Sequence, residues 1–182
     1  MKARLKTFLL TSLGSIALFS AVTFTSCNDD KCKAIVCASG GVCNDGDCLC
    51  ASGYEGNQCE TETREKFKGI WYVTEDGTLS TTAQYTISVE AVAEEAKTTE
   101  VTITNFRNSF TRPVNAYVKA DTLYIPQQVI NGNTVQGIGH IDDDPTYGIH
   151  GILTLRYSVK DVNNITDDFG LTPAGKASVW NK

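Results

Sequence analysis

Residues 31–60 read KCKAIVCASGGVCNDGDCLCASGYEGNQCE, and this stretch decides how the chain is organised. It holds all but one of the 7 cysteines of the chain. A segment this short cannot bury enough apolar surface to fold unaided, whereas each disulfide of a small exported domain contributes about 2–5 kcal/mol. Six cysteines permit fifteen pairings, and their spacing alone does not choose among them. The stretch is therefore predicted to be a disulfide-stapled module that uses Cys32, Cys37, Cys43, Cys48, Cys50 and Cys59.

The last part of this stretch resembles an EGF-like domain. A Cys48-Leu49-Cys50 step is followed by an eight-residue interval with the family's pattern of glycine, aromatic residue and glycine, here Gly53, Tyr54 and Gly56, before Cys59. The resemblance covers the whole module. It implies the pairing of the family, which in this chain is Cys32–Cys43, Cys37–Cys48 and Cys50–Cys59.

A cysteine cluster can also bind zinc. Zinc sites usually combine two separated pairs of closely spaced thiolates, whereas these six cysteines lie at uneven intervals with no histidine nearby. Calcium-binding EGF-like domains carry an acidic pair directly before the first cysteine, where this chain has Lys31. We therefore expect disulfides in residues 32–59, and neither a metal nor another cofactor.

The N-terminus has the pattern of a secretory signal peptide. Three basic residues precede an apolar stretch over residues 8–23, and small polar residues lead to Cys27. The sequence Phe24-Thr25-Ser26-Cys27 resembles the lipobox of bacterial lipoproteins. This resemblance implies a signal peptide over residues 1–26 and a diacylglycerol and further fatty acyl chains such as palmitate on Cys27, with residues 27–31 as a tether to the lipid bilayer. The alternative is a soluble secreted protein with one free thiol.

Charge limits the possible partners. The segment 1–26 carries three basic and no acidic residues, so without it the formal net charge falls from −5 to −8. An acidic surface repels phosphate backbones, which argues against nucleic acid as a partner. Asn28, Asp29 and Asp30 resemble the export signals that send Bacteroidota-type lipoproteins to the outer face of the outer membrane, although a solvated linker is the alternative. Disulfides fit either the periplasm or the cell surface, and we expect an outer-membrane protein that faces the exterior.

Residues 60–66 are predicted to form a charged hinge, and residues 67–182 a domain that is mostly β. Apolar residues alternate with polar ones in run after run, for example in Tyr85-Thr86-Ile87-Ser88-Val89 and from Ile149 to Tyr157. Period two with frequent breaks is typical of antiparallel strands with one buried face. Short connections favour a meander that closes into a barrel, because closure removes exposed edges; a β-sandwich is the alternative.

The start of this domain resembles that of lipocalin-like (calycin) barrels. Phe67, Gly69 and Trp71 lie in Phe67-Lys68-Gly69-Ile70-Trp71-Tyr72, which matches the F-x-G-x-W-Y opening of the family. The resemblance implies that Trp71 packs across the floor of the barrel. We find no C-terminal arginine placed to cover this tryptophan. The order of lipobox, EGF-like module and β domain is also similar to that of uncharacterised Bacteroidota lipoproteins, which suggests an architecture but no activity.

Only His140 and His150 could act as imidazole ligands or bases. A hairpin that turns at residues 142–147 would place them opposite each other, near three aspartates, which suggests a metal site. Alternation puts both on the polar outer face, however, so we expect a solvated acidic turn and no metal. Catalysis is not expected either, because no thiol is left over and neither histidine accompanies a nucleophile motif such as G-x-S-x-G.

Two functions remain. The first is a non-catalytic interaction module for a protein or glycan partner, and the second is a carrier of a small apolar ligand. They differ in what fills the barrel. Gly137, Gly139 and Gly151 share the inward face with Phe67, Trp71, Tyr85 and Tyr157, so large aromatic rings could lie across glycines. We therefore expect a filled interior and an interaction module. The sequence does not indicate an oligomeric state.

Overall fold

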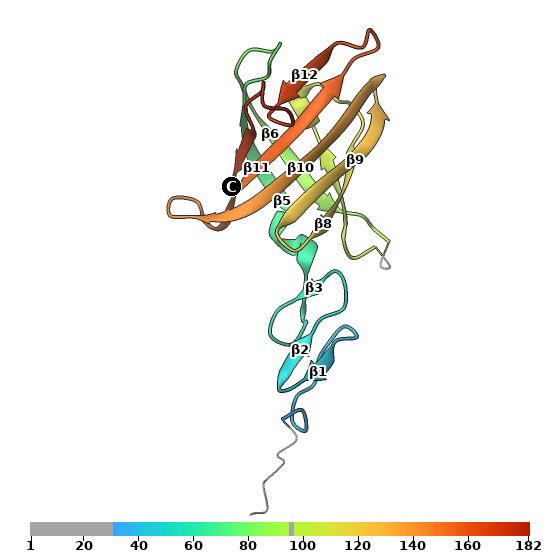
Figure 1. Ribbon diagram of the computed structural model, residues 1–182, viewed down its shortest axis with the longest axis vertical. Coiled ribbons are helices and arrows are strands. Elements are labelled where there is room, and N and C mark those ends of the chain that lie inside the picture. The colour runs from blue at the N-terminus through green and yellow to red at the C-terminus, as the bar shows by residue number, and fades with distance from the viewer. Residues whose placement is uncertain (1–30, 95–96) are drawn as a thin grey trace, which may run out of the picture.

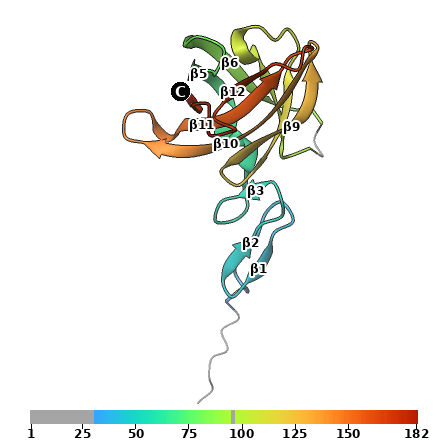
Figure 2. The ribbon, with the colours of Figure 1, turned by 45° about the horizontal axis from the view of Figure 1, so that its top comes forward.

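The computed structural model describes residues 31–94 and 97–182. The predicted signal peptide, Cys27 and the acidic residues after it lie outside this part of the chain. Figures 1 and 2 show a slender N-terminal module at one end of the long axis and a β-barrel at the other. The chain enters the barrel directly from the module.

The module is built from two short hairpins. β1 (Val42–Asn44) pairs with β2 (Asp47–Leu49) across the turn residues Asp45 and Gly46, which both have positive φ angles, as a tight two-residue turn requires. β3 (Tyr54–Glu55) pairs with β4 (Thr61–Glu62). Three disulfides hold these hairpins together, and their pairing is the one that the EGF-like resemblance implies: Cys32–Cys43, Cys37–Cys48 and Cys50–Cys59.

Eight antiparallel strands form the barrel. Neighbours along the chain pair with each other except at the closure, where β13 pairs with both β11 and β5. β12 (Thr166–Phe169) extends the sheet beside the end of β11. The predicted barrel is thus confirmed, and the alternative of a sandwich is wrong. The barrel strands are β5 (Gly69–Glu75), β6 (Ala83–Ala91), β7 (Glu100–Thr104), β8 (Val114–Lys119), β9 (Thr122–Ile130), β10 (Asn133–Asp144), β11 (Gly148–Lys160) and β13 (Ser178–Asn181).

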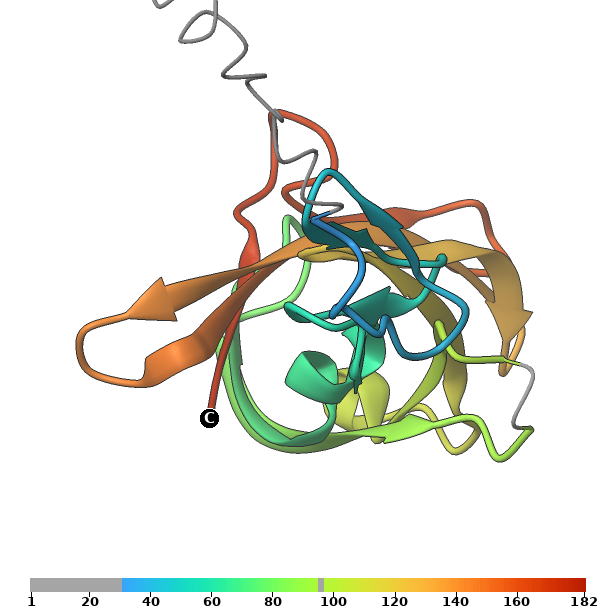
Figure 3. The ribbon, with the colours of Figure 1, turned by 90° about the horizontal axis from the view of Figure 1, so that it is seen from below.

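The predicted inward position of Ile149 is wrong. The alternation places Ile149 on the inner face with Gly151, but its side chain is 77% exposed. The β10–β11 hairpin continues past the barrel wall as a projecting arm, which Figures 2 and 3 show clearly. His150 has a φ of 52°, so the alternation of side chains is interrupted between the arm and the barrel part of β11. We use "arm" below for residues 142–150.

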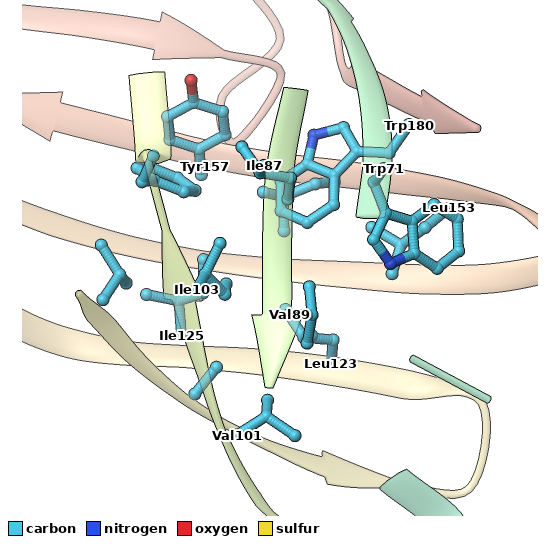
Figure 4. Packing of buried hydrophobic residues seen from close by; sticks show 14 of the residues in the cluster. Trp71, Ile87, Val89, Val101, Ile103, Leu123, Ile125, Leu153, Tyr157 and Trp180 are labelled. Atoms are coloured by element: carbon cyan, nitrogen blue, oxygen red, sulfur yellow. The ribbon is translucent and has the colours of Figure 1, made fainter. Parts of the chain in front are cut away.

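Aromatic side chains fill the interior of the barrel (Figure 4). Tyr157 stacks on Phe169 with ring centroids 4.3 Å apart, and Phe106 meets the edge of Tyr157 at 4.9 Å. Phe106 comes from η2 (Phe106–Asn108), a short 3-10 helix in the β7–β8 connection. The fully buried aromatic residues are Phe67, Trp71, Phe106, Tyr157, Phe169 and Trp180.

Two inward glycines make room for these and other large side chains. A Cβ atom on Gly137 would lie 2.6 Å from the Cβ of Tyr157, and one on Gly139 would lie 3.1 Å from the side chains of Leu153 and Leu155. Glycine in a strand interior thus permits a bulky neighbour, as the sequence suggested. The space that a carrier would offer to a ligand is occupied by the protein itself.

The floor of the barrel faces the module. η1 (Thr63–Phe67) lies across this opening in Figure 3, and the indole nitrogen of Trp71 donates to the carbonyl oxygen of Phe67 at 2.8 Å. No arginine was expected to cover Trp71, and the residue that does so is Lys182: its ammonium nitrogen lies 4.4 Å from the centre of the Trp71 ring and donates to the carbonyl of Lys66 at 2.6 Å. The C-terminus therefore helps to close the floor.

Candidate functional site

The junction between module and barrel is held by a buried arginine. The sequence predicts a charged hinge over residues 60–66, and in the structure residues 61–66 belong to β4 and η1. Arg64 is only 7% exposed, and its Nε donates to the carboxylate of Glu62 at 2.6 Å. Its Nη1 reaches carbonyl oxygens at both ends of the β6–β7 connection, those of Val92, Lys97 and Glu100. Arg64 therefore joins the segment that follows the module to the β6–β7 connection of the barrel.

Lys66 joins the module to the barrel. Its Nζ lies 2.8 Å from a carboxylate oxygen of Glu55 in the module and 2.6 Å from one of Asp121 in the β8–β9 turn. Burial lowers the pKa of Lys66, but the hydrogen bonds to Asp121 and Glu55 outweigh it, and the net pKa lies above its ordinary value. The hydrogen bond from Lys66 in turn lowers the pKa of Asp121. Both groups are therefore charged at neutral pH.

A groove of about 610 Å³ runs along this junction. Residues 50–55 of the module form one side, and Thr99 and residues 117–120 of the barrel form the other. Tyr117, at its edge, is 42% exposed and stacks on Tyr124 with the ring centroids 5.0 Å apart. The groove and the stacked tyrosines make this side of the molecule partly aromatic.

The sequence predicts that the two histidines lie opposite each other on the hairpin, and this is wrong, because His140 faces Thr154 across the β10–β11 pair. His140 and His150 line a pocket of about 420 Å³ together with Asp121, Asp142 and Asp143. His140 Nε2 is 3.4 Å from Asp142 Oδ1, whereas Asp143 accepts a hydrogen bond from the backbone of His150 at 2.8 Å. Within the described residues, no three such side chains converge as metal ligands would. The aspartates of this hairpin instead fix its backbone.

A buried carboxylate near the far end of the barrel is one residue that our sequence reasoning missed. Glu75 accepts hydrogen bonds from Tyr85 at 2.8 Å, from Tyr157 at 2.8 Å and from Ser178 at 3.0 Å. Burial and the charge of Glu75 raise the pKa values of both tyrosines, so they remain protonated donors. The signal was present in the sequence, because Glu75 continues the inward alternation of Trp71 and Val73. The Glu75 carboxylate is buried and accepts three hydrogen bonds from the protein, so its role is structural.

An ion pair and a short helix close the same end. Arg107 lies 2.8 Å from Asp167 and places its guanidinium 4.9 Å from the centre of the Phe169 ring. Burial raises the pKa of Asp167, but hydrogen bonds from Leu79 and Ser80 and the Arg107 charge outweigh it, and the net pKa is lowered. With η1 at the floor and η2 at this end, helices cover both openings of the barrel.

Comparison with known families identifies the module. A family model described as a Teneurin-like EGF domain matches residues 35–62, which confirms the EGF-like domain. No curated protein matches the chain. Among the described residues, no helix is long and apolar enough to cross a membrane.

Proposed function

We propose that this protein is a lipid-anchored, non-catalytic binding protein of a bacterial cell envelope, which engages a protein or glycan partner through the outside of its barrel. The observation that carries this proposal is the filled interior: six aromatic side chains and the two 3-10 helices occupy the volume that a carrier would keep for its ligand. A barrel of this size holds either its own side chains or one small ligand, so the contacts that remain available lie on its outer surface.

The arrangement of the two domains suits a tether at the N-terminus. The described part of the chain begins at the end of the module that is far from the barrel (Figure 1), and Cys27 precedes it by a few residues. Arg64 and Lys66 fix the module to the barrel floor. An acylated Cys27 would therefore hold the barrel at a distance from the bilayer, with the EGF-like module as a rigid spacer.

The same geometry argues against an enzyme. The most enclosed carboxylate, Glu75, already accepts three hydrogen bonds, and the six cysteines of the module are paired. The acidic net charge of the chain also argues against nucleic acid as a partner, because it repels phosphate backbones.

Metabolic labelling with a fatty acid tests the anchor. Cells that express the full chain should incorporate label into the protein, and Cys27→Ser should abolish the label and leave an unprocessed precursor. Ser26→Ala is the matched control, because it changes the neighbouring residue and keeps Cys27. Labelled Cys27→Ser protein would refute the lipidation site.

Protease treatment of intact cells tests the orientation. We expect the barrel to be accessible from outside, as a protein of the outer leaflet would be. Full protection until the outer membrane is broken would place the protein in the periplasm.

Extraction of the purified protein with organic solvent tests the interior: a stoichiometric apolar compound in the extract would support the carrier and contradict an interaction module.

A further inference from the structure

A second pocket lies where the arm passes beside the barrel wall. It has a volume of about 490 Å³, within the range of roughly 300–1,000 Å³ that is usual for small-molecule sites. The arm contributes Tyr147, and the wall contributes residues from β5, β6 and β13. We call it the arm pocket.

The wall of the arm pocket presents neutral hydrogen-bonding groups in register. Tyr72 on β5 lies opposite Thr86 on β6 and opposite Asn181 on β13. One pair further along, Thr74 faces Gln84, whose amide nitrogen is 3.3 Å from the threonine hydroxyl. Amides and hydroxyls both donate and accept hydrogen bonds. All residues that line the pocket are uncharged at neutral pH, in a chain that is 20% charged overall.

Two tyrosines from different parts of the chain stand at this pocket with much of their surface exposed. Tyr72 is 60% exposed and Tyr147 is 46% exposed. A ring of this kind offers an apolar face and a polar hydroxyl. The pocket therefore combines flat apolar surfaces with amides and hydroxyls.

The position of Tyr147 is fixed by the backbone of the arm. The carboxylate of Asp144 accepts hydrogen bonds from the N–H groups of Thr146 and Tyr147 at 2.7 and 3.1 Å. The tip folds back so closely that a Cβ atom on Gly151 would collide with the carbonyl oxygen of Tyr147. The backbone N–H of Lys182 donates to the carbonyl of Gly151 at 3.2 Å and ties the arm to the end of β13. Such bracing reduces the entropy that is lost when a ligand binds.

From this geometry we infer that the arm pocket binds a neutral oligosaccharide. A pyranose ring has an apolar C–H face, which suits a tyrosine ring, and a rim of hydroxyls that donate and accept hydrogen bonds, which suits Thr74, Gln84 and Asn181. A charged ligand would find no counter-charge among the lining residues, in contrast to the neighbouring pocket that contains His140 and His150. The inference rests on the proposed function, because it gives the class of ligand and the site for that binding protein.

Binding to immobilised neutral oligosaccharides tests the inference. The full chain, in a zwitterionic detergent without sugar headgroups, is applied to an array of α- and β-linked glucans, mannans, xylans and galactans, and hits are measured by titration calorimetry. We expect at least one of these to bind, and Tyr147→Ala and Tyr72→Ala each to lower its affinity by about tenfold. Tyr147→Phe keeps the ring face and should retain most of the affinity.

The matched control is Tyr117→Ala, which removes an exposed tyrosine far from the arm pocket and should leave the affinity unchanged. A loss with Tyr117→Ala and not with Tyr147→Ala would assign the sugar to the junction and overturn the arm pocket. Absence of binding to every sugar of the array would overturn the inference. These binding results do not depend on fatty-acid labelling of Cys27 or on the solvent extraction of the barrel. The sugar site and the proposed function can therefore be refuted independently.

Discussion

The EGF-like module and the barrel are adjacent along the chain, yet different interactions stabilise them. Among the described residues of the module only Cys59 is buried, and three disulfides crosslink the module. The barrel contains no cysteine and has a continuous core that includes Trp71, Tyr157 and Trp180. A module of thirty residues has too little interior to exclude water, whereas a closed sheet of eight strands encloses a core without covalent links. Oxidation thus supports one half of the molecule and apolar burial the other.

The largest effect should come from reduction of the disulfides, which should unfold the module and leave the barrel folded. Without the disulfides, each worth about 2–5 kcal/mol in small domains, the module should unfold. The barrel should keep its melting transition, and fluorescence reports it selectively because Trp71 and Trp180 both lie there. Hydrogen exchange of residues 32–59, with and without reductant, follows the module in the same samples. A tryptophan transition that disappears together with the module would mean that the barrel depends on it.

Truncation of the tryptophan at the floor should destabilise the barrel strongly. Trp71→Ala removes a fully buried ring and its hydrogen bond to Phe67, and the cost should be about 3–5 kcal/mol. Tyr72→Ala is the matched control, because the adjacent residue points outward and should cost no more than about 0.5 kcal/mol. Urea unfolding followed by the fluorescence of Trp180 measures both. Equal losses for the two variants would contradict the assigned inner face.

The buried arginine at the junction should have an intermediate effect. Arg64→Ala removes the side-chain hydrogen bonds to Glu62 and to the carbonyl oxygens of Val92, Lys97 and Glu100, which should cost about 1–3 kcal/mol in urea unfolding. Arg64→Lys should not restore the loss, because a lysine cannot reproduce the planar fork of the guanidinium. Arg112→Ala, at an exposed position, is the control. An Arg64→Ala protein as stable as the control would show that residues 60–66 do behave as a solvated hinge.

Much of this fold could be predicted from the sequence because two local patterns are strong. The resemblance to EGF-like domains around Cys48 and Cys50 implied the disulfide pairing, and period-two alternation indicated the barrel strands and their inner face. Trp71 was expected on the floor and lies there. Alternation within a strand indicates which of its faces is buried, whatever the conformation of the connecting loops.

The remaining features depend on where connections fold. Alternation says nothing about a loop that turns inward, so the use of Phe106 as a plug was not foreseen; the residues around it, Asn105 and Arg107, adopt positive φ angles that their types do not require. Arg64 lies in a charged run that resembles a solvated linker, and only the distant carbonyl groups of the β6–β7 connection explain its burial. The arm pocket combines Tyr72 with Tyr147, which are far apart in sequence, so no local motif marks it.

The smallest effect should come from the ion pairs that join the two halves. Glu55 and Asp121 are partly exposed, so each pair with Lys66 should contribute no more than about 1 kcal/mol. The expected result of Lys66→Met is therefore a looser junction with little change in either melting transition. NMR relaxation measures it: residues 32–59 and 67–182 should tumble with similar correlation times in the parent and with distinct ones in the variant. Lys68→Met is the control, because Lys68 forms an ion pair with the nearby Glu65 of the same segment.

The pH dependence of the same junction can be derived from its two charges. The folded pKa of Asp121 is lowered, so its contribution is present above the ordinary value of 3.8 and is lost as the pH falls through the lower folded pKa. The folded pKa of Lys66 is raised, so its contribution is present below the ordinary value of 10.5 and is lost as the pH rises through the higher folded pKa. The parent junction should thus be tight across the neutral range and loosen at both extremes, while Lys66→Met should be loose throughout. A junction that stays tight in Lys66→Met would assign the coupling of the two halves to Arg64 and the backbone bond from Thr63 to Gly53 instead.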